Sequence, residues 1–279
     1  MTETASPTSP EGPRALAIPP RPPALEGIPV GERRAIVVGA SSGMGAAIVR
    51  QLAQEGYQVA ALARRAGELE SLKAELDPVA KAAGGAVTVR AVDASDAGAA
   101  PALFEELVLG LGGLDLFIYA AGVMPKLERT EYPTDKDLSV LDVNCAGLVA
   151  WGNLAAHLFT TQRRGTLVGI SSIAGDRGRK GFPVYCASKA FMNTYLEALR
   201  NRLSEVGVHV CTIKPGFVDT AMTRGMKGLF WLISAEEAAR QILAAARKRV
   251  NTRYVPGRWF FVGTTIKLIP SFVFRKLNF

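Results

Sequence analysis

The chain has 279 residues, of which 48% are hydrophobic, so it holds enough apolar material for one or two folded domains and is not a wholly disordered protein. The net charge of +8 is concentrated in residues 240–279, which carry nine Lys or Arg and no Asp or Glu, so the remaining residues sum to about −1. The three cysteines have no metal-ligand spacing and are predicted to be reduced thiols of a cytoplasmic protein.

The N-terminal segment is rich in proline. Half of the 16 prolines fall within residues 7–29, and the segment lacks the basic start and apolar run of a signal peptide. We therefore predict a disordered or polyproline II arm over residues 1–33.

From residue 34 the sequence alternates between short apolar segments rich in β-branched residues and longer segments of helical character. Strands are predicted at 34–40, 57–63, 86–92, 114–120, 165–171 and 208–214, and helices at 43–55, at 66–83, from 95, at 135–161 and at 183–204. Strands that are apolar on both faces and alternate with helices indicate a parallel sheet covered on both sides. We predict a single doubly wound α/β domain, a Rossmann-type fold, over residues 34–257, followed by a tail over residues 258–279.

Three glycines lie where the first predicted strand ends and the first helix begins: Gly39, Gly43 and Gly45, with the spacing G-x-x-x-G-x-G. Glycine allows a sharp turn and a close approach of the backbone to a pyrophosphate, which then meets the N–H groups and positive dipole end of the helix. Glycines are common in tight turns, but their position in the first strand–turn–helix unit favours a dinucleotide site.

The end of the second predicted strand distinguishes the two nicotinamide dinucleotides. NAD binding usually requires an Asp or Glu there, whereas this strand ends with Ala63 followed by Arg64 and Arg65. A guanidinium pairs with a 2′-phosphate through charge-assisted hydrogen bonds, so NADP(H) is favoured over NAD(H). Arg64 is the better candidate because it lies nearer the strand end; the alternative is that both arginines only begin a solvated helix.

Asp93 ends the third predicted strand at the same edge of the sheet. Two roles stay open for its carboxylate: accepting a hydrogen bond from the adenine amino group, or capping the helix that follows.

The segment SSIAGDRGRKGFPVYCASKAF, residues 171–191, combines hydroxyl groups with basic residues. Tyr185 and Lys189 are one helical turn apart, so both side chains project from the same face of a helix. The ordinary tyrosine pKa, near 10, is too high for acid–base work at neutral pH, and a nearby ammonium helped by an oxidised nicotinamide lowers it. Tyr185 is the candidate proton donor to a carbonyl oxygen, and Ser172 could stabilise the same oxygen. The alternative is a serine-rich turn followed by an ordinary amphipathic helix.

With these motifs the sequence resembles the short-chain dehydrogenases/reductases over roughly residues 34–257. The resemblance implies catalytic roles for Asn144, Ser172 (rather than Ser171), Tyr185 and Lys189, with Asn144 holding a water of a proton relay to the lysine. Together with the candidates above, cofactor contacts are expected from Gly39, Ser41, Ser42, Gly43, Met44, Gly45, Arg64, Asp93, Ala121, Gly122, Tyr185, Lys189, Pro215, Gly216, Val218 and Thr220.

Two positions depart from the family pattern. The family's NNAG is YAAG here, from Tyr119 to Gly122, and the threonine before the first glycine is Val38. The first change puts the packing beside the cofactor pocket in doubt, but not the chemistry.

The segment after Thr220 is short and apolar, with Phe230 and Trp231, and suits a lid over a hydrophobic substrate. The tail RWFFVGTTIKLIPSFVFRKLNF is too short, and too broken by Lys267 and Pro270, to span a bilayer. Two alternatives stay open: the tail lies on a membrane surface, or it packs on the core or at a subunit interface. The runs SSIAGDRGRKGFPVYCASK and IPSFVFRKL are similar to the decaprenylphosphoryl keto-pentose reductase branch, whose members reduce a ketone on a polyprenyl-phosphate-linked sugar.

We therefore predict an NADP(H)-dependent reductase of a hydrophobic or lipid-linked ketone, which forms a homodimer or homotetramer and is cytoplasmic and peripheral to the cytoplasmic membrane face. The alternatives are a soluble reductase of small carbonyls or steroid-like alcohols, and a nucleotide-sensing module without catalysis. The intact catalytic positions argue against the sensing module. The basic tail lacks the repeated stacking pattern of a nucleic-acid binder, and the sequence contains no metal-ligand cluster.

Overall fold

The computed structural model describes residues 33–128, 130–226 and 228–277. The arm predicted over residues 1–33 therefore lies outside the described residues, apart from Arg33.

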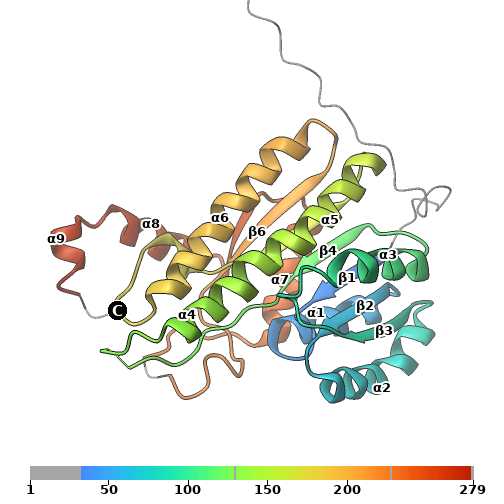
Figure 1. Cartoon of the computed structure of the whole chain (residues 1–279), viewed down its shortest axis with the longest axis horizontal. Coiled ribbons are helices and arrows are strands. Elements are labelled where there is room, and N and C mark those ends of the chain that lie inside the picture. Colours follow the sequence, from blue (N-terminus) through green and yellow to red (C-terminus); the bar gives the residue numbers. More distant parts are fainter. Residues whose placement is uncertain (1–32, 129, 227, 278–279) are drawn as a thin grey trace, which may run out of the picture.

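The described chain forms a parallel sheet of seven strands in the order β3-β2-β1-β4-β5-β6-β7 (Figure 1). The strands are β1 (Arg34–Val38), β2 (Gln58–Ala63), β3 (Ala86–Ala91), β4 (Leu116–Tyr119), β5 (Thr166–Ile170), β6 (His209–Pro215) and β7 (Thr252–Val255). The chain order reverses between β1 and β4, which is the switch point where doubly wound sheets bind their ligands. The predicted fold is confirmed, and β7 is an edge strand that the sequence analysis missed because only its last two residues are buried.

Helices cover both faces of the sheet. On one face α1 (Gly43–Gln54), α2 (Ala66–Ala82) and α7 (Ala235–Arg247) pack against Ala35 and Val37 of β1. On the other face α3 (Ala100–Leu111), α5 (Gly147–Gln162) and α6 (Pro183–Ser204) pack against Ile36 and Val38. Because side chains alternate along a strand, a strand that is buried between two helical layers has to be apolar at every position.

One long helix runs from Thr134 to Gln162. It consists of α4 (Thr134–Leu141), a π-helical turn η2 (Asp142–Ala146) and α5, so the helix predicted at 135–161 is confirmed with an inserted π turn. The helix is long and apolar enough to cross a membrane by composition, but its side chains Trp151 and Phe159 are fully buried against the sheet. It is a core helix in this fold.

The helix predicted from residue 95 begins five residues later, at Ala100. Asp96 accepts hydrogen bonds from the N–H groups of Gly98 and Ala99, and these local turns take the place of a first helical turn.

The tail forms two helices, α8 (Trp259–Leu268) and α9 (Ser271–Phe274), at the end of the molecule where α6 begins (Figure 1). Trp259 is 3% exposed and packs with Ile173 and Tyr254, so the tail is anchored to the core by its first turn. In contrast, Phe261 is 71% and Leu268 is 78% exposed. The first turn of the tail therefore packs on the core, and contact of its exposed residues with a membrane surface stays a prediction.

Candidate active site

The glycine loop connects β1 to α1 and needs glycine for two separate reasons. Gly39 has a φ of +93°, and a Cβ there would lie 2.4 Å from the backbone nitrogen of Ala121. A Cβ on Gly45 would lie 2.1 Å from the carbonyl oxygen of Gly39. The N-cap residue Ser42 makes no side-chain hydrogen bond to α1, so the first N–H groups of this helix lack a side-chain cap. This loop therefore fits the pyrophosphate of a dinucleotide.

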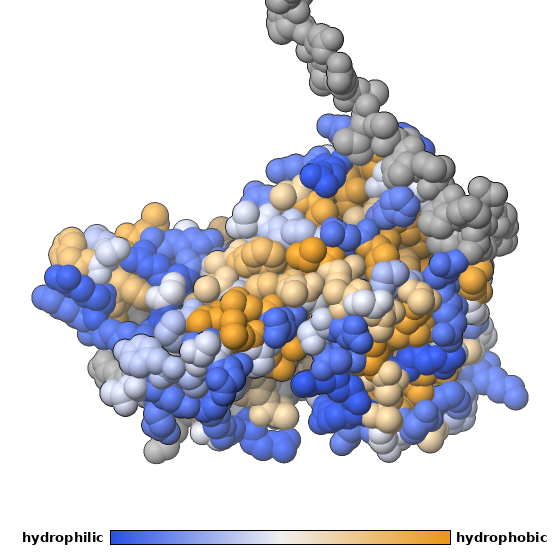
Figure 2. All heavy atoms as spheres, in the orientation of Figure 1, coloured by the Kyte–Doolittle hydropathy of each residue, from blue (hydrophilic) through white to orange (hydrophobic). Residues whose placement is uncertain are grey.

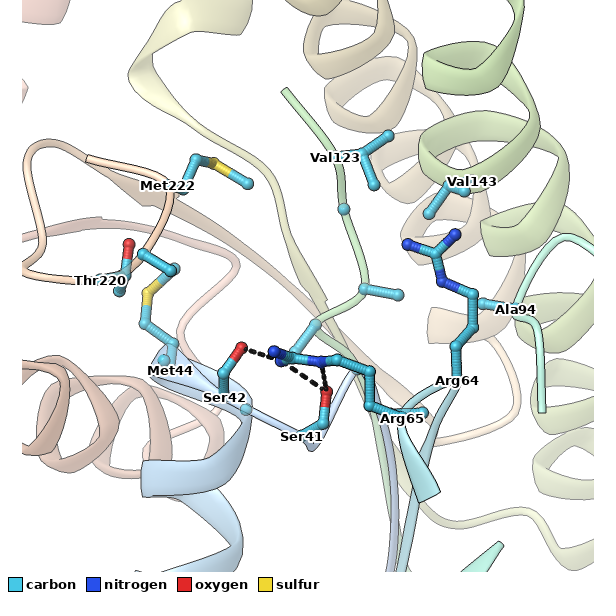
Figure 3. A pocket seen from close by; sticks show the side chains of 18 of the residues that line it. Ser41, Ser42, Met44, Arg64, Arg65, Ala94, Val123, Val143, Thr220 and Met222 are labelled. Atoms are coloured by element: carbon cyan, nitrogen blue, oxygen red, sulfur yellow. Dashed lines mark hydrogen bonds between the residues drawn. The ribbon is translucent and has the colours of Figure 1, made fainter. Parts of the chain in front are cut away.

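The two arginines after β2 point in different directions (Figure 3). The Arg65 guanidinium donates hydrogen bonds to the hydroxyls of Ser41, at 2.9 Å, and Ser42, at 2.7 Å. The nearest carboxylate oxygen to Arg64 is that of Asp93, 3.8 Å from Nη1. Arg65 thus lies against the glycine loop, whereas the choice of Arg64 as the partner of a 2′-phosphate stays a prediction.

Asp93 is occupied locally. Its Oδ1 accepts hydrogen bonds from the backbone nitrogen and the hydroxyl of Ser95, and these bonds hold the pKa of Asp93 below its ordinary value. The carboxylate caps the turn at Ser95 and not the helix α3, which begins only at Ala100. Asp93 also lines the pocket, so a contact with the adenine stays a prediction.

A pocket of about 540 Å³ lies over the carboxyl ends of β1, β2 and β4. Of the expected cofactor residues it brings together Gly39, Ser41, Ser42, Gly43, Met44, Gly45, Arg64, Asp93, Ala121, Gly122 and Thr220. Arg65, the less favoured of the two arginine candidates, also lines the pocket. Further lining residues were not predicted, and all of them are small or apolar: Ala63, Val92, Ala94, Ala120, Val123, Val143, Ala221 and Met222.

The structure separates the two serines at the end of β5. The Ser171 hydroxyl is buried and donates to the carbonyl oxygen of Lys189, so it belongs to the core. Ser172 caps the short helix η3 (Ile173–Asp176), where its hydroxyl accepts a hydrogen bond from the Ala174 nitrogen. Of the two serines, Ser172 is the one that influences the pKa of Tyr185.

The pKa of the Tyr185 phenol lies above its ordinary value. Burial raises it, and the Ser172 hydroxyl and the charge of Arg179 offset the rise only in part. The Nζ of Lys189 lies 5.7 Å from the centre of the Tyr185 ring and donates to the carbonyl oxygen of Ile170, at 3.0 Å. A lowering of the Tyr185 pKa by Lys189 together with an oxidised nicotinamide stays a prediction.

Lys189 itself is 4% exposed, and burial lowers its pKa to about 8. A Cβ on Gly122 would lie 3.4 Å from Lys189 Nζ and 3.4 Å from Asn144 Oδ1. Both side chains therefore approach the same face of Gly122, which lines the pocket.

The π turn η2 sets the position of Asn144. The Asn144 side chain accepts from the Val123 nitrogen at 2.9 Å and donates to the Ser188 hydroxyl at 3.0 Å. The Ser188 hydroxyl in turn donates to the carbonyl oxygen of Tyr185 at 2.8 Å. Hydrogen bonds thus connect Asn144 to the helix that carries the tyrosine, and π turns of this kind are frequent at functional sites.

The replacement of the family's asparagine by Tyr119 is compensated within the fold. Tyr119 is fully buried, and its hydroxyl donates to the carbonyl oxygen of Val143 in the π turn at 2.5 Å. A Cβ on Gly147 would lie 2.3 Å from this hydroxyl, so Gly147 makes the space that the larger side chain needs. The doubt about packing at this position is resolved, because Tyr119 supports the turn that carries Asn144.

Of the remaining residues expected to contact the cofactor, those at the end of β6 and after it lie in different surroundings. Thr220 lines the pocket, whereas Val218 is buried and pairs with Ile233. Pro215 ends β6, and a Cβ on Gly216 would lie 2.1 Å from the Trp259 ring. Pro215, Gly216 and Val218, as well as Tyr185 and Lys189, are not among the residues that line the 540 Å³ pocket.

Aromatic residues connect the segment after Thr220 to the tail. Phe230 lies 4.9 Å from Trp259, ring centre to ring centre, and Trp231 lies 5.7 Å from it. Phe217 completes the cluster at 5.2 Å from Trp259. An apolar surface of aromatic rings therefore lies next to the segment that carries Thr220.

The comparisons with known proteins agree with this geometry. The sequence model of the short chain dehydrogenase family matches residues 33–228. The chain belongs to the short-chain dehydrogenase/reductase family. It is an NAD(P)-dependent oxidoreductase, as the resemblance of its motifs implied.

Two relatives are named as oxidoreductases. An uncharacterized oxidoreductase of Myxococcus xanthus is 38% identical over 68% of this chain and 74% of its own length. An uncharacterized oxidoreductase of Staphylococcus aureus is 33% identical over 69% of this chain and 80% of its own.

Solved structures share the fold at lower identity. A short-chain type dehydrogenase/reductase from Mycobacterium ulcerans covers 88% of this chain and 98% of its own with a TM-score of 0.75 at 21% identity. A 3-oxoacyl-[acyl-carrier protein] reductase from Brucella melitensis covers 80% and 90% with a TM-score of 0.71 at 23% identity. At this identity the likeness concerns the fold alone.

Proposed function

We propose that this short-chain dehydrogenase/reductase uses NADPH to reduce a ketone on a hydrophobic or lipid-linked substrate. The observation that carries the proposal is the cationic end of the pocket, where Arg64 and Arg65 line the wall at the end of β2. An Asp or Glu at this strand end would repel a 2′-phosphate, whereas a guanidinium pairs with it. The test is NADPH and NADH oxidation against a panel of carbonyl compounds that includes lipid-linked sugars.

The pocket residues fit the parts of the dinucleotide. The glycine loop and the N-terminus of α1 would hold the pyrophosphate, and Arg65 with Arg64 would hold the 2′-phosphate. Asp93 would accept from the adenine, and Thr220 would contact the nicotinamide amide. The reduced nicotinamide supplies the hydride when it is bound.

The chain's own residues handle the proton. Tyr185 donates it to the carbonyl oxygen, and the Ser172 hydroxyl stabilises the charge on that oxygen and on the phenolate that forms. The Ser172 hydroxyl and the charge of Arg179 stabilise the Tyr185 phenolate and so favour release of its proton, against the effect of burial. Lys189 and Asn144 then return a proton to the Tyr185 phenolate. The Lys189 pKa of about 8 allows the ammonium to lose and regain a proton near neutral pH.

Substrate hydrophobicity is supported by the aromatic cluster of Phe217, Phe230, Trp231 and Trp259. The face of α8 and α9 that points away from the core continues this apolar character, and Figure 2 shows hydrophobic and hydrophilic residues side by side on these helices. We propose that this face rests on the cytoplasmic surface of a membrane, where the enzyme meets a lipid-linked substrate.

The membrane proposal predicts reversible binding to anionic vesicles. Each buried apolar side chain contributes ~2 kcal/mol and each nearby basic residue ~1 kcal/mol. Exchanging both Phe261 and Leu268 for serine should therefore lower the partition coefficient at least ~10-fold in vesicle sedimentation, and binding of the unaltered protein should fall as salt rises. The matched control is Leu109→Ser, since Leu109 is also an exposed leucine but lies on α3.

An unaltered protein that ignores anionic vesicles at low salt would remove the membrane proposal. Deletion of the whole tail is a poorer test than these substitutions, because it would uncover Ile173 and Tyr254 beneath Trp259. Thermal melting and NADPH affinity of each variant show that the fold is retained.

We also propose that the chain forms a homodimer or homotetramer through the face of α4 and α6. Figure 2 shows a band of hydrophobic residues over α4, α5 and α6. The exposed apolar side chains of α4 and α6 include Leu138, Leu141 and Phe191. Phe191→Glu places a charge in this band and should convert the oligomer to a monomer, as measured by light scattering at micromolar concentration. A monomeric unaltered protein would contradict the proposal.

A further inference from the structure

A second cavity lies between the loop that follows η3 and the end of the tail. Its volume is about 340 Å³. It is lined by Arg177, Gly178, Arg179, Lys180, Ser271, Phe274, Arg275 and Leu277. Four of these residues are cations, and none of the described lining residues is acidic.

The nearest carboxylate in the sequence does not neutralise the positive charge of this cavity. Asp176 is the carboxylate nearest in sequence, and its side chain is 1% exposed. Its Oδ1 accepts from Lys214 at 2.7 Å and from Lys267 at 2.9 Å, and its Oδ2 accepts from Tyr254 at 2.6 Å. Burial alone would raise the pKa of Asp176, but these hydrogen bonds outweigh it. One carboxylate therefore pairs with two lysines, so Asp176 does not neutralise the four cations that line the cavity.

Arg177 fixes the shape of the cavity. Its guanidinium donates to the carbonyl oxygen of Lys267 at 3.0 Å and to the Ser271 hydroxyl at 3.2 Å. It also lies 4.6 Å from the centre of the Phe274 ring. Arg177 thus holds the tail to the loop that follows η3. The other three cations, Arg179, Lys180 and Arg275, line the cavity that this contact fixes.

Arg179 connects the cavity to the catalytic tyrosine. Its Nε is buried and has no hydrogen-bond partner in the described part of the chain. Its positive charge lowers the pKa of Tyr185, so the guanidinium is within electrostatic reach of the proposed proton donor. A buried donor without a partner is costly unless a ligand satisfies it.

We propose that this cavity, the cationic cleft, binds a phosphoryl group carried by the ketone substrate. Guanidinium and ammonium groups from Arg179, Lys180 and Arg275 match the several oxygens and the charge of a phosphoryl group better than a single carboxylate. The inference rests on the proposed ketone reduction and adds the chemical class of the substrate. The family model ends at residue 228, so the half of the cleft that the tail supplies lies outside the stretch that this model matches.

The first experiment measures binding without turnover. Pyrophosphate is titrated into the protein saturated with NADP⁺, which fills the site at Arg64 and Arg65, and heat is recorded by calorimetry. Exchanging Lys180 and Arg275 together for glutamine should weaken pyrophosphate binding ~10-fold or more, because charge-assisted hydrogen bonds are lost. Lys248→Gln is the matched control, since Lys248 is an exposed cation at the end of α7. Equal binding by all three proteins would overturn the proposal.

The second experiment measures preference. NADPH oxidation is followed with a hydrophobic ketone and with the same ketone bearing a phosphate monoester. The unaltered enzyme should show a kcat/KM at least ~10-fold higher for the phosphorylated ketone, mainly through KM, and the Lys180 and Arg275 exchange should remove this ratio. A ratio near one in the unaltered enzyme would overturn the proposal while ketone reduction stands.

A cleft that served lipid headgroups instead would behave differently. In that case the exchange would lower binding to phosphatidylglycerol vesicles and leave the preference for the phosphorylated ketone unchanged, which would overturn the assignment to the substrate. If neither ketone is reduced, the proposed function fails, and the calorimetric result still shows whether the cleft binds a phosphoryl group.

Discussion

Tyr185→Phe should lower kcat for ketone reduction by at least ~10², because the substitution removes the proton donor and leaves the ring in place. The hydroxyl is the only part of Tyr185 that the proposed proton transfer uses. The phenyl ring of the variant continues to fill the space near Lys189. NADPH binding, followed by the change in its fluorescence, should be retained. The measurement is a comparison of kcat and of the cofactor dissociation constant in the two proteins.

A matched control for this substitution is Tyr57→Phe. Tyr57 precedes β2, packs against the core cluster around α1 and lies outside the site, so its hydroxyl should be dispensable for turnover. Near-normal turnover in Tyr185→Phe would overturn the assignment of the acid. A loss of NADPH binding together with turnover would instead indicate that the phenyl ring had moved.

The sheet and most of its helices follow from the sequence because apolar runs and glycines carry their signal locally. Six of the seven strands of the described sheet were predicted, and the helix α6 begins at Pro183 and ends at Ser204 as expected. The start of α3 was missed because the aspartate side chain of Asp96 competes for backbone N–H groups, which a periodicity argument does not register.

The contents of the site depend on contacts between distant residues, and these were harder to predict. Tyr119 reads as a disruption in isolation, but Gly147, 28 positions later, makes room for its hydroxyl. The sequence left two alternatives open for the tail, and only the contact of Trp259 with Ile173 and Tyr254 shows that its first turn packs on the core. Sequence spacing places residues on an element, but it does not say which distant element meets them.

The sequence places Arg64 and Arg65 after β2 but does not say which of them contacts the glycine loop. A second substitution with a large expected effect follows from that contact. Arg65→Glu should lower kcat/KM with NADPH at least ~50-fold, because two charge-assisted hydrogen bonds worth ~1.5 kcal/mol or more each are replaced by repulsion. kcat/KM with NADH should change much less, since NADH lacks the 2′-phosphate. The measured quantity is the ratio of kcat/KM for the two cofactors, which cancels a general loss from the broken contacts with Ser41 and Ser42.

Arg64→Glu is the matched substitution at the neighbouring position. Arg64 has its nearest acidic partner at 3.8 Å, in Asp93, and its guanidinium makes no contact with the glycine loop comparable to that of Arg65. If Arg65 is the main ligand of the 2′-phosphate, the Arg64 substitution lowers the cofactor ratio less, and Arg65→Lys keeps part of the preference because it keeps the charge. A larger loss from Arg64→Glu would restore Arg64 as the main ligand and leave Arg65 as a brace of the glycine loop. Equal losses with NADPH and NADH in both variants would mean that neither guanidinium recognises the phosphate, and the preference for NADPH would lose its physical basis.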